Sequence, residues 1–337
     1  MVLTVQVVLE GRCREPPVEC GTRGTHYTRS FVTADSVISI RGISKRYGSL
    51  QAVDNLHLDV APGETLGFLG LNGAGKTTTI RILLDLLRPT QGHAFILGHD
   101  CQSDGLKARA RIGYLPGEMG VYADMTGLAV LDLLAGLSGQ AVNKTYRREL
   151  QERLQFPDSD VRRKLREYST GMKRKLGLIQ AFEADPLLLI LDEPTEGLDP
   201  LMQESFYGIV ADVKRRGRTV FMSSHVLSEV DRVCDRIALL RKGELVLLST
   251  VGEIRKLAAR RVRVSFDGEA APPGGLPPGS EIVDSRAGVW NLKVQGELGP
   301  LLRFMAGLPV KDIEVAEPSL EDVVLKYYRE GSPEVNQ

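Results

Sequence analysis

The segment from Gly70 to Thr77 combines glycines, a lysine and a threonine at a spacing that can hold phosphate groups. Its residues, Gly-Leu-Asn-Gly-Ala-Gly-Lys-Thr, fit the pattern G-x-x-x-x-G-K-[ST]. Glycines let consecutive backbone N–H groups close around phosphate oxygens, and a helix that starts next points its positive end at the same anion. We expect Lys76 to reach the β and γ phosphates of a nucleotide, and Thr77 to place its hydroxyl on Mg²⁺.

A second segment delivers two acids at the end of an apolar run. Residues 187–191 are all leucine or isoleucine, and Asp192 and Glu193 follow directly. Ligands of open α/β sheets bind at the carboxyl ends of the strands. We expect Asp192 to be a ligand of Mg²⁺. We expect Glu193 to polarise an attacking water molecule, because phosphoryl transfer to water needs an oriented nucleophile.

The elements that must position these groups alternate between strand and helix patterns. A helix is predicted over 77–87, before Pro89, and another over 200–214. A hairpin is predicted around Lys242–Gly243. The predicted strands cover 37–41, 56–60, 67–69, 187–191, 219–222, 235–240 and 245–248. This alternation predicts an α/β fold whose sheet is mainly parallel and covered on both faces.

The domain organisation follows from changes of pattern along the 337 residues. A prior of roughly 150 residues per domain gives about two domains. We expect a disordered N-terminal extension over 1–36 and a core domain over 37–255. Within that core, 117–184 reads as an almost purely helical subdomain, and 260–330 reads as a small α+β domain.

The composition of the chain limits which partners it can bind and in which cellular compartment we expect it. Lys+Arg 43 balance Asp+Glu 43, which gives no overall electrostatic footprint for nucleic acid. We therefore interpret the basic run 173–175 as a solvated helix face. No apolar stretch approaches the length of a membrane span, so we expect no span here. The scattered cysteines predict free thiols in a reducing compartment; they are Cys13, Cys20, Cys101 and Cys234.

Further segments carry a resemblance to a known family. Tyr-Ser-Thr-Gly-Met at 168–172 resembles the signature motif of ABC ATPases, and 196–199 resembles their D-loop. His225 lies where that family has its switch histidine. Tyr47 matches the aromatic residue that stacks on adenine. The resemblance extends over about 37–250 with the motifs in the family's order.

The resemblance implies a P-loop NTPase core of the ABC type with a helical subdomain, plus the small C-terminal domain. Its cofactors are ATP and Mg²⁺. The catalytic residues it implies are Glu193, His225 and Lys76, and the metal ligands are Thr77 and Asp192. The implied nucleotide-binding residues are Tyr47, Gly70, Asn72, Gly73, Ala74, Gly75, Lys76, Thr77, Thr78, Ser169, Gly171 and Asp199.

The same resemblance also implies partners. The chain looks most like the ATP-binding subunits of exporters, which pair with a separate integral-membrane permease and often carry a small C-terminal domain. It implies a head-to-tail homodimer or pseudo-dimer, with each nucleotide between Lys76 of one subunit and Ser169 and Gly171 of the other. We expect a peripheral location at the cytoplasmic face of the cell membrane, and no nucleic-acid partner.

Three positions depart from the family pattern. Gly117 stands where a glutamine is usual, with Glu118 next as a possible substitute. Thr170 and Met172 replace Gly and Gln in the signature motif, and Glu196 replaces Ser in the D-loop. These departures leave open a regulatory module that hydrolyses ATP weakly. A soluble ABC ATPase acting on ribosomes or DNA is a further alternative, although the chain has one phosphate loop and no zinc motif.

Overall fold

A six-stranded sheet forms the centre of the structure, a computed structural model that describes residues 36–118, 123–139, 142–268, 275–286, 288–316 and 320–330. Apart from Ser36, the expected N-terminal extension lies outside the described residues. The strand order is β10-β9-β3-β8-β7-β6. Four of its neighbouring pairs are parallel and β9–β10 is antiparallel. The strands are β3 (Thr65–Leu69), β6 (Ile112–Leu115), β7 (Leu188–Asp192), β8 (Thr219–Ser224), β9 (Arg236–Arg241) and β10 (Glu244–Thr250).

The central strands supply both layers of the core, because successive residues of a strand point to opposite faces of the sheet. One face carries Leu189, Leu191, Val220, Met222, Ile237 and Leu239. The other face carries Leu188, Ile190, Phe221, Ala238 and Leu240. Both faces are covered, which explains why these strands read as continuous apolar runs in the sequence.

A second sheet covers one of these faces and differs from the parallel arrangement that we predicted. Its order is β2-β1-β4-β5 and all of its pairs are antiparallel. The short helix α1 packs in the same core layer. The bounds are β1 (Ile38–Tyr47), β2 (Leu50–Val60), β4 (Gln91–Ile96), β5 (His99–Asp100), α1 (Lys76–Leu83) and α2 (Gly105–Arg109). Helix α1 ends four residues before the predicted end, and Asp85 just beyond it adopts a left-handed φ of 55°.

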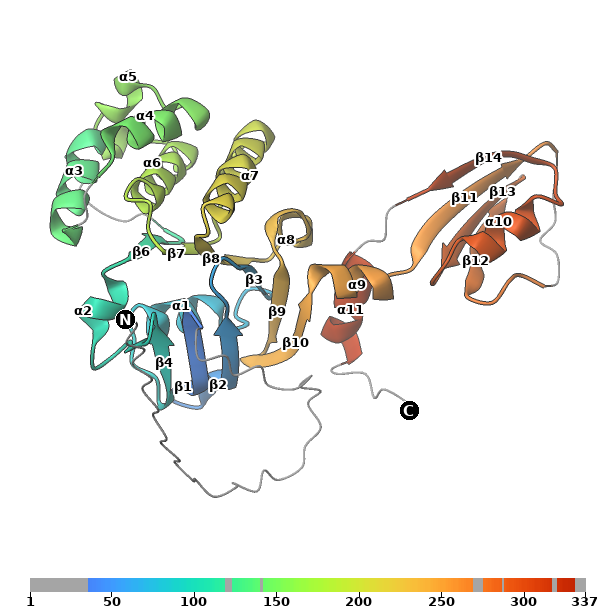
Figure 1. Ribbon diagram of the computed structural model, residues 1–337, viewed down its shortest axis with the longest axis horizontal. Helices are drawn as coiled ribbons and strands as arrows, with labels where there is room; N and C mark the ends of the chain where they lie inside the picture. Colours follow the sequence, from blue (N-terminus) through green and yellow to red (C-terminus); the bar gives the residue numbers. More distant parts are fainter. Residues whose placement is uncertain are drawn as a thin grey trace, which may run out of the picture.

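Helices form a lobe at one side of the central sheet (Figure 1). Figure 1 shows them grouped in one lobe above β6 and β7, with the long α7 alongside. Helix α6 contacts both α3 and β6, so it joins this lobe to the central sheet. The bounds are α3 (Gly127–Ser138), α4 (Lys144–Arg153), α5 (Asp158–Val161), the 3-10 turn η1 (Leu165–Glu167), α6 (Thr170–Phe182) and α7 (Pro200–Arg215).

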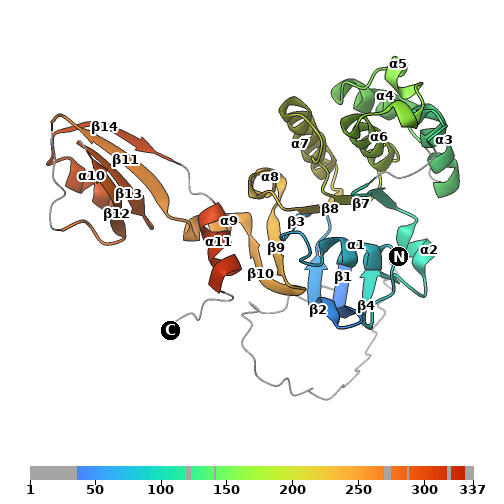
Figure 2. The same ribbon diagram turned by 180° about the vertical axis from the view of Figure 1, so that it is seen from behind.

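The C-terminal part forms a third sheet that stands apart from the main core (Figures 1 and 2). Its order is β12-β13-β11-β14, it is antiparallel, and Trp290 is buried in its core. The bounds are β11 (Arg260–Phe266), β12 (Ser280–Arg286), β13 (Val289–Val294), α10 (Gly299–Met305) and β14 (Val310–Val315).

The last helix returns to the main core instead of packing on the small sheet. Helix α11 (Leu320–Glu330) contacts α8 (Leu227–Val233) and α9 (Val251–Leu257). Its Leu320 and Val324 belong to the same buried cluster as the central sheet. The span 260–330 therefore contributes to two packing units, and the small sheet is attached to the core through α9 and through α11.

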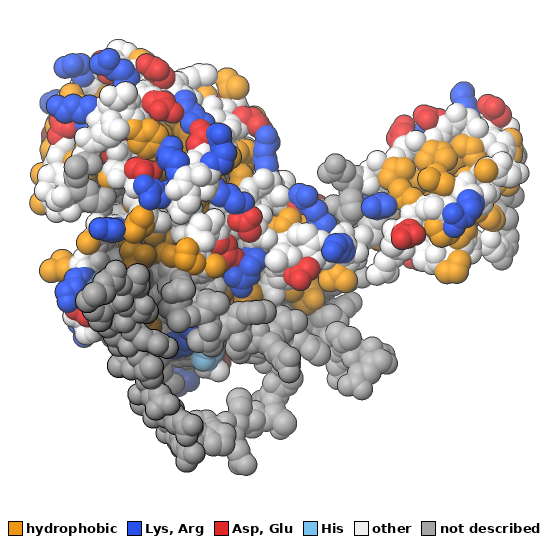
Figure 3. Space-filling model, in the orientation of Figure 1, with side chains coloured by type: hydrophobic (Ala, Val, Ile, Leu, Met, Phe, Trp, Pro, Cys, Tyr) orange, Lys and Arg blue, Asp and Glu red, His pale blue; other side chains and the backbone are white. Residues whose placement is uncertain are grey.

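The visible surface mixes charge with small apolar areas. Figure 3 shows orange side chains between the helical lobe and the sheets below it, and again over the small C-terminal sheet. Leu86 and Leu106 are among the large apolar side chains exposed to solvent. Within the described parts of the chain, no helix combines the length and the apolar character needed to cross a bilayer.

The helical lobe packs closely against the sheet at Gly113 in β6. A Cβ atom on this residue would lie 2.0 Å from the backbone oxygen of Ala181 in α6 and 2.7 Å from Pro186 Cγ. Backbone atoms cannot move aside as a flexible side chain can. Only glycine therefore allows α6 and β6 to pack at this distance.

Replacing Gly113 with alanine should consequently destabilise the fold. We expect Gly113→Ala to lower the free energy of unfolding by ~1–3 kcal/mol, the usual cost of overpacking. Gly136 on α3 is a matched control, because its added Cβ would meet nothing within 4 Å. Gly136→Ala should instead raise stability by about 0.5–1 kcal/mol through helix propensity. Urea unfolding measures both, and equal stability of the two variants would contradict the close contact.

Candidate functional site

The phosphate loop connects β3 to α1 in a conformation that depends on its glycines. A Cβ on Gly75 would lie 2.4 Å from the backbone oxygen of Ala52, and its φ is 107°. Gly73 also has a left-handed φ of 81°, and a Cβ on Gly70 would lie 2.8 Å from Leu240 O. Non-glycine residues rarely adopt such φ values. The loop is thus held tightly by β2 and β9, with the N-terminus of α1 directly behind it.

Side chains of this loop divide into buried and exposed groups. Lys76 is 6% exposed, and its Nζ donates a hydrogen bond of 2.5 Å to Gly70 O across the loop. Asn72 and Thr77 are exposed, and Thr78 is half-buried. Ala74 is buried and its carbonyl accepts a 3.0 Å hydrogen bond from Gly243 N in the β9–β10 turn. The exposed residues face solvent, from which a phosphate would approach.

Asp192 ends β7 deep in the structure, with 2% of its surface exposed. Ser223 on the neighbouring strand β8 donates a 2.6 Å hydrogen bond to Asp192 Oδ1. The same hydroxyl accepts a 3.0 Å hydrogen bond from Glu193 N. Ser223 therefore fixes both acids, and the sequence analysis did not identify it. The feature of the sequence that could have identified Ser223 is its place directly after the predicted strand 219–222, beside a strand that ends in two acids.

Glu193 lies between two nitrogen groups that arrive from different elements. Its Oε1 is 3.1 Å from Lys76 Nζ, and its Oε2 is 2.7 Å from His225 Nδ1. The backbone of Glu193 has a φ of 50°, a left-handed value that costs a residue with a Cβ free energy. The structure thus brings together three parts of the sequence that are far apart: Lys76, the adjacent acids Asp192 and Glu193, and His225.

A second polar cluster supports the segment that carries His225. Glu229 in α8 is buried and accepts hydrogen bonds from Thr195 Oγ1 and, at 2.7 Å, from Ser224 Oγ. Ser224 Oγ also accepts a 2.9 Å hydrogen bond from Val226 N. The loop around His225 is therefore fixed to the turn after β7. The sequence did not predict this cluster either.

The signature residues lie at the start of α6. Ser169 is its N-cap residue, and its hydroxyl accepts a 3.2 Å hydrogen bond from Met172 N while the residue stays exposed. A Cβ on Gly171 would lie 2.9 Å from the backbone oxygen of Gly197, so the signature and the D-loop are in close contact. Asp199 is the N-cap residue of α7 and is exposed. No described contact joins these residues to Lys76 or Glu193 within this one chain.

Arg174 contradicts the interpretation of the run 173–175 as a solvated helix face. Its side chain is 6% exposed, and it donates hydrogen bonds to backbone oxygens of three separate segments. The neutral overall charge does not predict whether one particular side chain is buried. Helical spacing, by contrast, places Arg174 one turn before the buried Leu178, on the same face of α6. That spacing was the signal in the sequence.

Tyr47, which we expect to stack on adenine, is the last residue of β1 and is 46% exposed. Lys45 Nζ lies 5.2 Å from the centre of its ring, so the ring already interacts with a cation. The hairpin that Tyr47 forms with Leu50 leads into Ala52, whose carbonyl borders Gly75. Tyr47 is therefore placed near the loop by β2, although no contact with the loop is described.

The oxygen atoms around Asp192 fit a magnesium ion. Mg²⁺ favours one or two carboxylates together with substrate phosphates. Asp192 Oδ1 is used by Ser223, and Oδ2 faces Gly117, where an added Cβ would lie 3.4 Å away. The missing side chain at residue 117 keeps that side of the carboxylate open. Glu118, expected as a possible substitute, is exposed.

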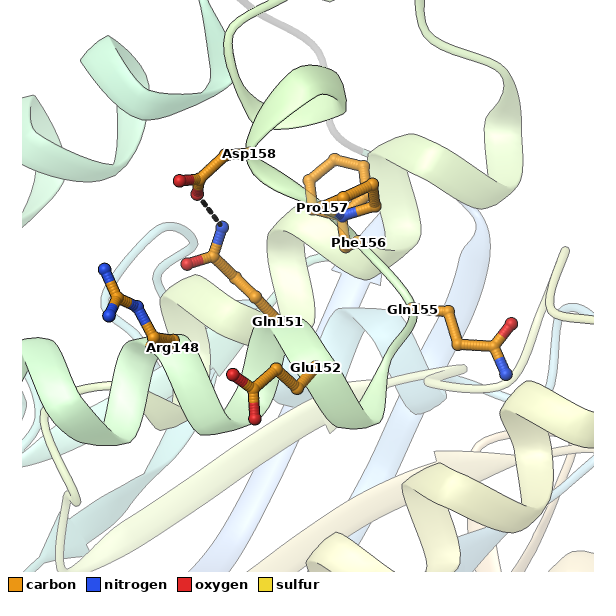
Figure 4. Close-up of a pocket in the computed structure, with 7 residues that line it drawn as sticks. All are labelled: Arg148, Gln151, Glu152, Gln155, Phe156, Pro157 and Asp158. Carbon is orange, nitrogen blue, oxygen red and sulfur yellow. Dashed lines mark hydrogen bonds between the residues drawn. The ribbon is translucent and has the colours of Figure 1, made fainter.

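A separate hollow of about 520 Å³ lies in the helical lobe, and the view in Figure 4 shows that it is formed by α4 and the start of α5. Gln151 donates a 3.4 Å hydrogen bond to Asp158 at its wall. Its lining residues are Arg148, Gln151, Glu152, Gln155, Phe156, Pro157 and Asp158. None of them belongs to the phosphate site.

Comparison with known proteins shows the family of this chain. The ABC transporter family matches residues 53–196. The daunorubicin resistance ATP-binding protein DrrA3 of Streptomyces coeruleorubidus is 33% identical over 304 residues, which cover 87% of this chain and 96% of that protein. The bacitracin transport ATP-binding protein BcrA of Bacillus licheniformis is 32% identical over 307 residues, covering 88% and 99%.

A solved structure of an ATP-binding subunit of an ABC transporter superposes with a TM-score of 0.60 and 27% identity, covering 66% of this chain and 92% of that one. The superposition and the two nearly full-length relatives point to the same family. This chain therefore belongs to the ABC transporter ATP-binding proteins and is an ABC-type ATPase.

Proposed function

We propose that this chain hydrolyses ATP to drive a separate membrane permease, in export. The placement of Glu193 between Lys76 and His225 is the observation that carries the hydrolytic part. The transport part rests on family membership and on relatives whose names refer to daunorubicin resistance and bacitracin transport. The chain would act at the cytoplasmic face of the membrane, where ATP is available.

In the proposed reaction the phosphate loop and Lys76 hold the β and γ phosphates. Thr77 and Asp192 would hold Mg²⁺, which would neutralise developing charge on the phosphates. Lys76 would exchange its contact with Glu193 for the phosphates. Glu193 then orients a water molecule and accepts its proton as the oxygen attacks the γ phosphorus. The bond to the β–γ bridging oxygen breaks, and ADP leaves. His225 keeps Glu193 oriented and faces the γ phosphate.

A second subunit would complete the site. Ser169 and Gly171 lie at the N-terminus of α6, a 13-residue helix, and Ser169 is exposed. The positive end of a helix favours an anion. Because no described contact joins Ser169 to Lys76 within the chain, we propose that Ser169 contacts the γ phosphate held by the partner in a head-to-tail dimer.

Replacing Glu193 with glutamine tests this mechanism. The amide keeps the shape of the side chain but cannot accept the proton, so ATP binding should persist while hydrolysis falls by at least roughly 10²-fold. With Mg-ATP present, size-exclusion chromatography should show Glu193→Gln at twice the monomer mass. Adding Ser169→Arg should abolish that dimer. Wild-type hydrolysis by Glu193→Gln would exclude Glu193 as the catalytic base.

Ser223→Ala tests the support that this hydroxyl gives to the two acids. Loss of a hydrogen bond to a metal ligand typically costs about 10–100-fold in metal affinity or activity. We expect the Mg²⁺ concentration for half-maximal ATPase activity to rise and kcat to fall. Ser205→Ala is the control, because the Ser205 hydroxyl donates a 3.2 Å hydrogen bond to Leu201 O within α7, away from the two acids. An unchanged Mg²⁺ dependence in Ser223→Ala would contradict the role.

Co-purification tests the proposed partner. The tagged chain, extracted from membranes in mild detergent, should bring with it an integral-membrane protein that has several spans. Mass spectrometry of the eluted complex identifies it. Recovery of the chain with ribosomes instead would favour the translation-associated class of ABC ATPase.

A further inference from the structure

Arg174 is a buried cation that joins segments distant in the sequence. It lies in the second turn of α6 and is 6% exposed. Its guanidinium donates hydrogen bonds to four backbone oxygens: Pro116 at 3.0 Å, Gly117 at 2.7 Å, Asp192 at 3.3 Å and Glu196 at 3.2 Å. The carboxylate of Glu196 approaches it at 3.7 Å. One side chain thus connects the loop after β6, the end of β7 and the D-loop to α6.

This arrangement requires arginine specifically. A guanidinium presents five N–H groups in a rigid plane, whereas an ammonium group is a single point with three donors. Burying a charge costs free energy unless hydrogen bonds satisfy it. Burial is the largest influence on the pKa of Arg174 and lowers it, while the acids at 196, 192 and 193 oppose that change.

Two of these bonds bracket the turn that carries Glu193. Arg174 bonds to the carbonyl of Asp192 at the start of the turn and to that of Glu196 at its end. Between them, Glu196 N donates a 3.1 Å hydrogen bond to Glu193 O. The left-handed φ of Glu193, 50°, is unfavourable for a side chain with a Cβ, so surrounding contacts must maintain it. Glu193 N donates a hydrogen bond to Ser223, and Arg174 holds the carbonyl oxygens of Asp192, one residue before Glu193, and of Glu196, three residues after it.

We propose that Arg174 is a positioning residue for hydrolysis: it holds the turn from Asp192 to Glu196 so that the Glu193 carboxylate lies between Lys76 and His225, and it fixes this turn to α6. The inference rests on the proposed role of Glu193. Because Ser169 begins the same helix, the position of the water-orienting carboxylate is tied to the residue proposed to contact the partner's nucleotide.

Arg174→Lys separates positioning from nucleotide binding. It keeps the charge but cannot bond to all four oxygens. We expect kcat for ATP to fall at least about 10-fold, as for other losses of supporting hydrogen bonds. KM should stay within about two-fold, since Arg174 does not contact Lys76 or the phosphate loop. Lys175→Gln is the matched control on the same helix, because its amino group donates a 3.5 Å hydrogen bond to Gln155 O, outside the turn from Asp192 to Glu196. A rise in KM with unchanged kcat would overturn the proposal.

A double-mutant cycle of Arg174 and Glu193 distinguishes a positioning role of Arg174 from a purely structural one. In the Glu193→Gln background, adding Arg174→Lys should leave the residual single-turnover rate unchanged, because the positioned group is already absent. Losses that multiply would show that Arg174 acts independently of Glu193, and would overturn this inference alone. Wild-type hydrolysis by Glu193→Gln itself would instead overturn the proposed function.

Thermal unfolding of each variant is measured beside its ATPase kinetics, to show that the variant folds. If Arg174→Lys does not fold, Arg174→Met takes its place in the same cycle, since it fills a similar volume without burying a charge. If neither variant shows a cooperative unfolding transition, Arg174 is a structural residue and the proposal is wrong.

Discussion

The parallel pairing of β8 with both β3 and β7 is the constraint on which the site depends. Its register sets Ser223 opposite Asp192 on one side and opposite Phe68, two residues before the phosphate loop, on the other. Side chains alternate between the faces of a sheet, so a slip of one residue would turn Ser223 away from the acids. The three strand ends therefore present the loop, the acids and His225 at one edge of the sheet.

Charge then organises what the strands bring together. The carboxylate of Glu193 is shared between Lys76 and His225. The backbone around it is held by the hydrogen bond from Glu193 N to Ser223 and by the hydrogen bond that Arg174 donates to Asp192 O. Electrostatic stabilisation of this kind is effective when the groups are fixed before the reaction begins.

The helical lobe and the small C-terminal sheet are joined to this centre in different ways. Gly113 lets α6 lie directly against β6, so the lobe that carries the signature residues is rigidly connected to the strand beside Asp192. The C-terminal sheet is connected through α9 and α11, which contact each other. Leu320 and Val324 of α11 enter the main core, so the chain is fixed to the core both before and after the small sheet.

The sequence by itself determined the phosphate loop, the acid pair after an apolar strand and the family, because these depend on residues adjacent in the chain. It also predicted the central strands, which are buried on both faces. It did not predict the antiparallel sheet, in which β1 pairs with β4 some 50 residues further along the chain. Nor did it predict the burial of Arg174, whose partners lie 18 to 58 residues away along the chain. Only the tertiary structure decided which hydroxyl bonds to Asp192 and which nitrogens flank Glu193, since those contacts arise from strand register and helix packing.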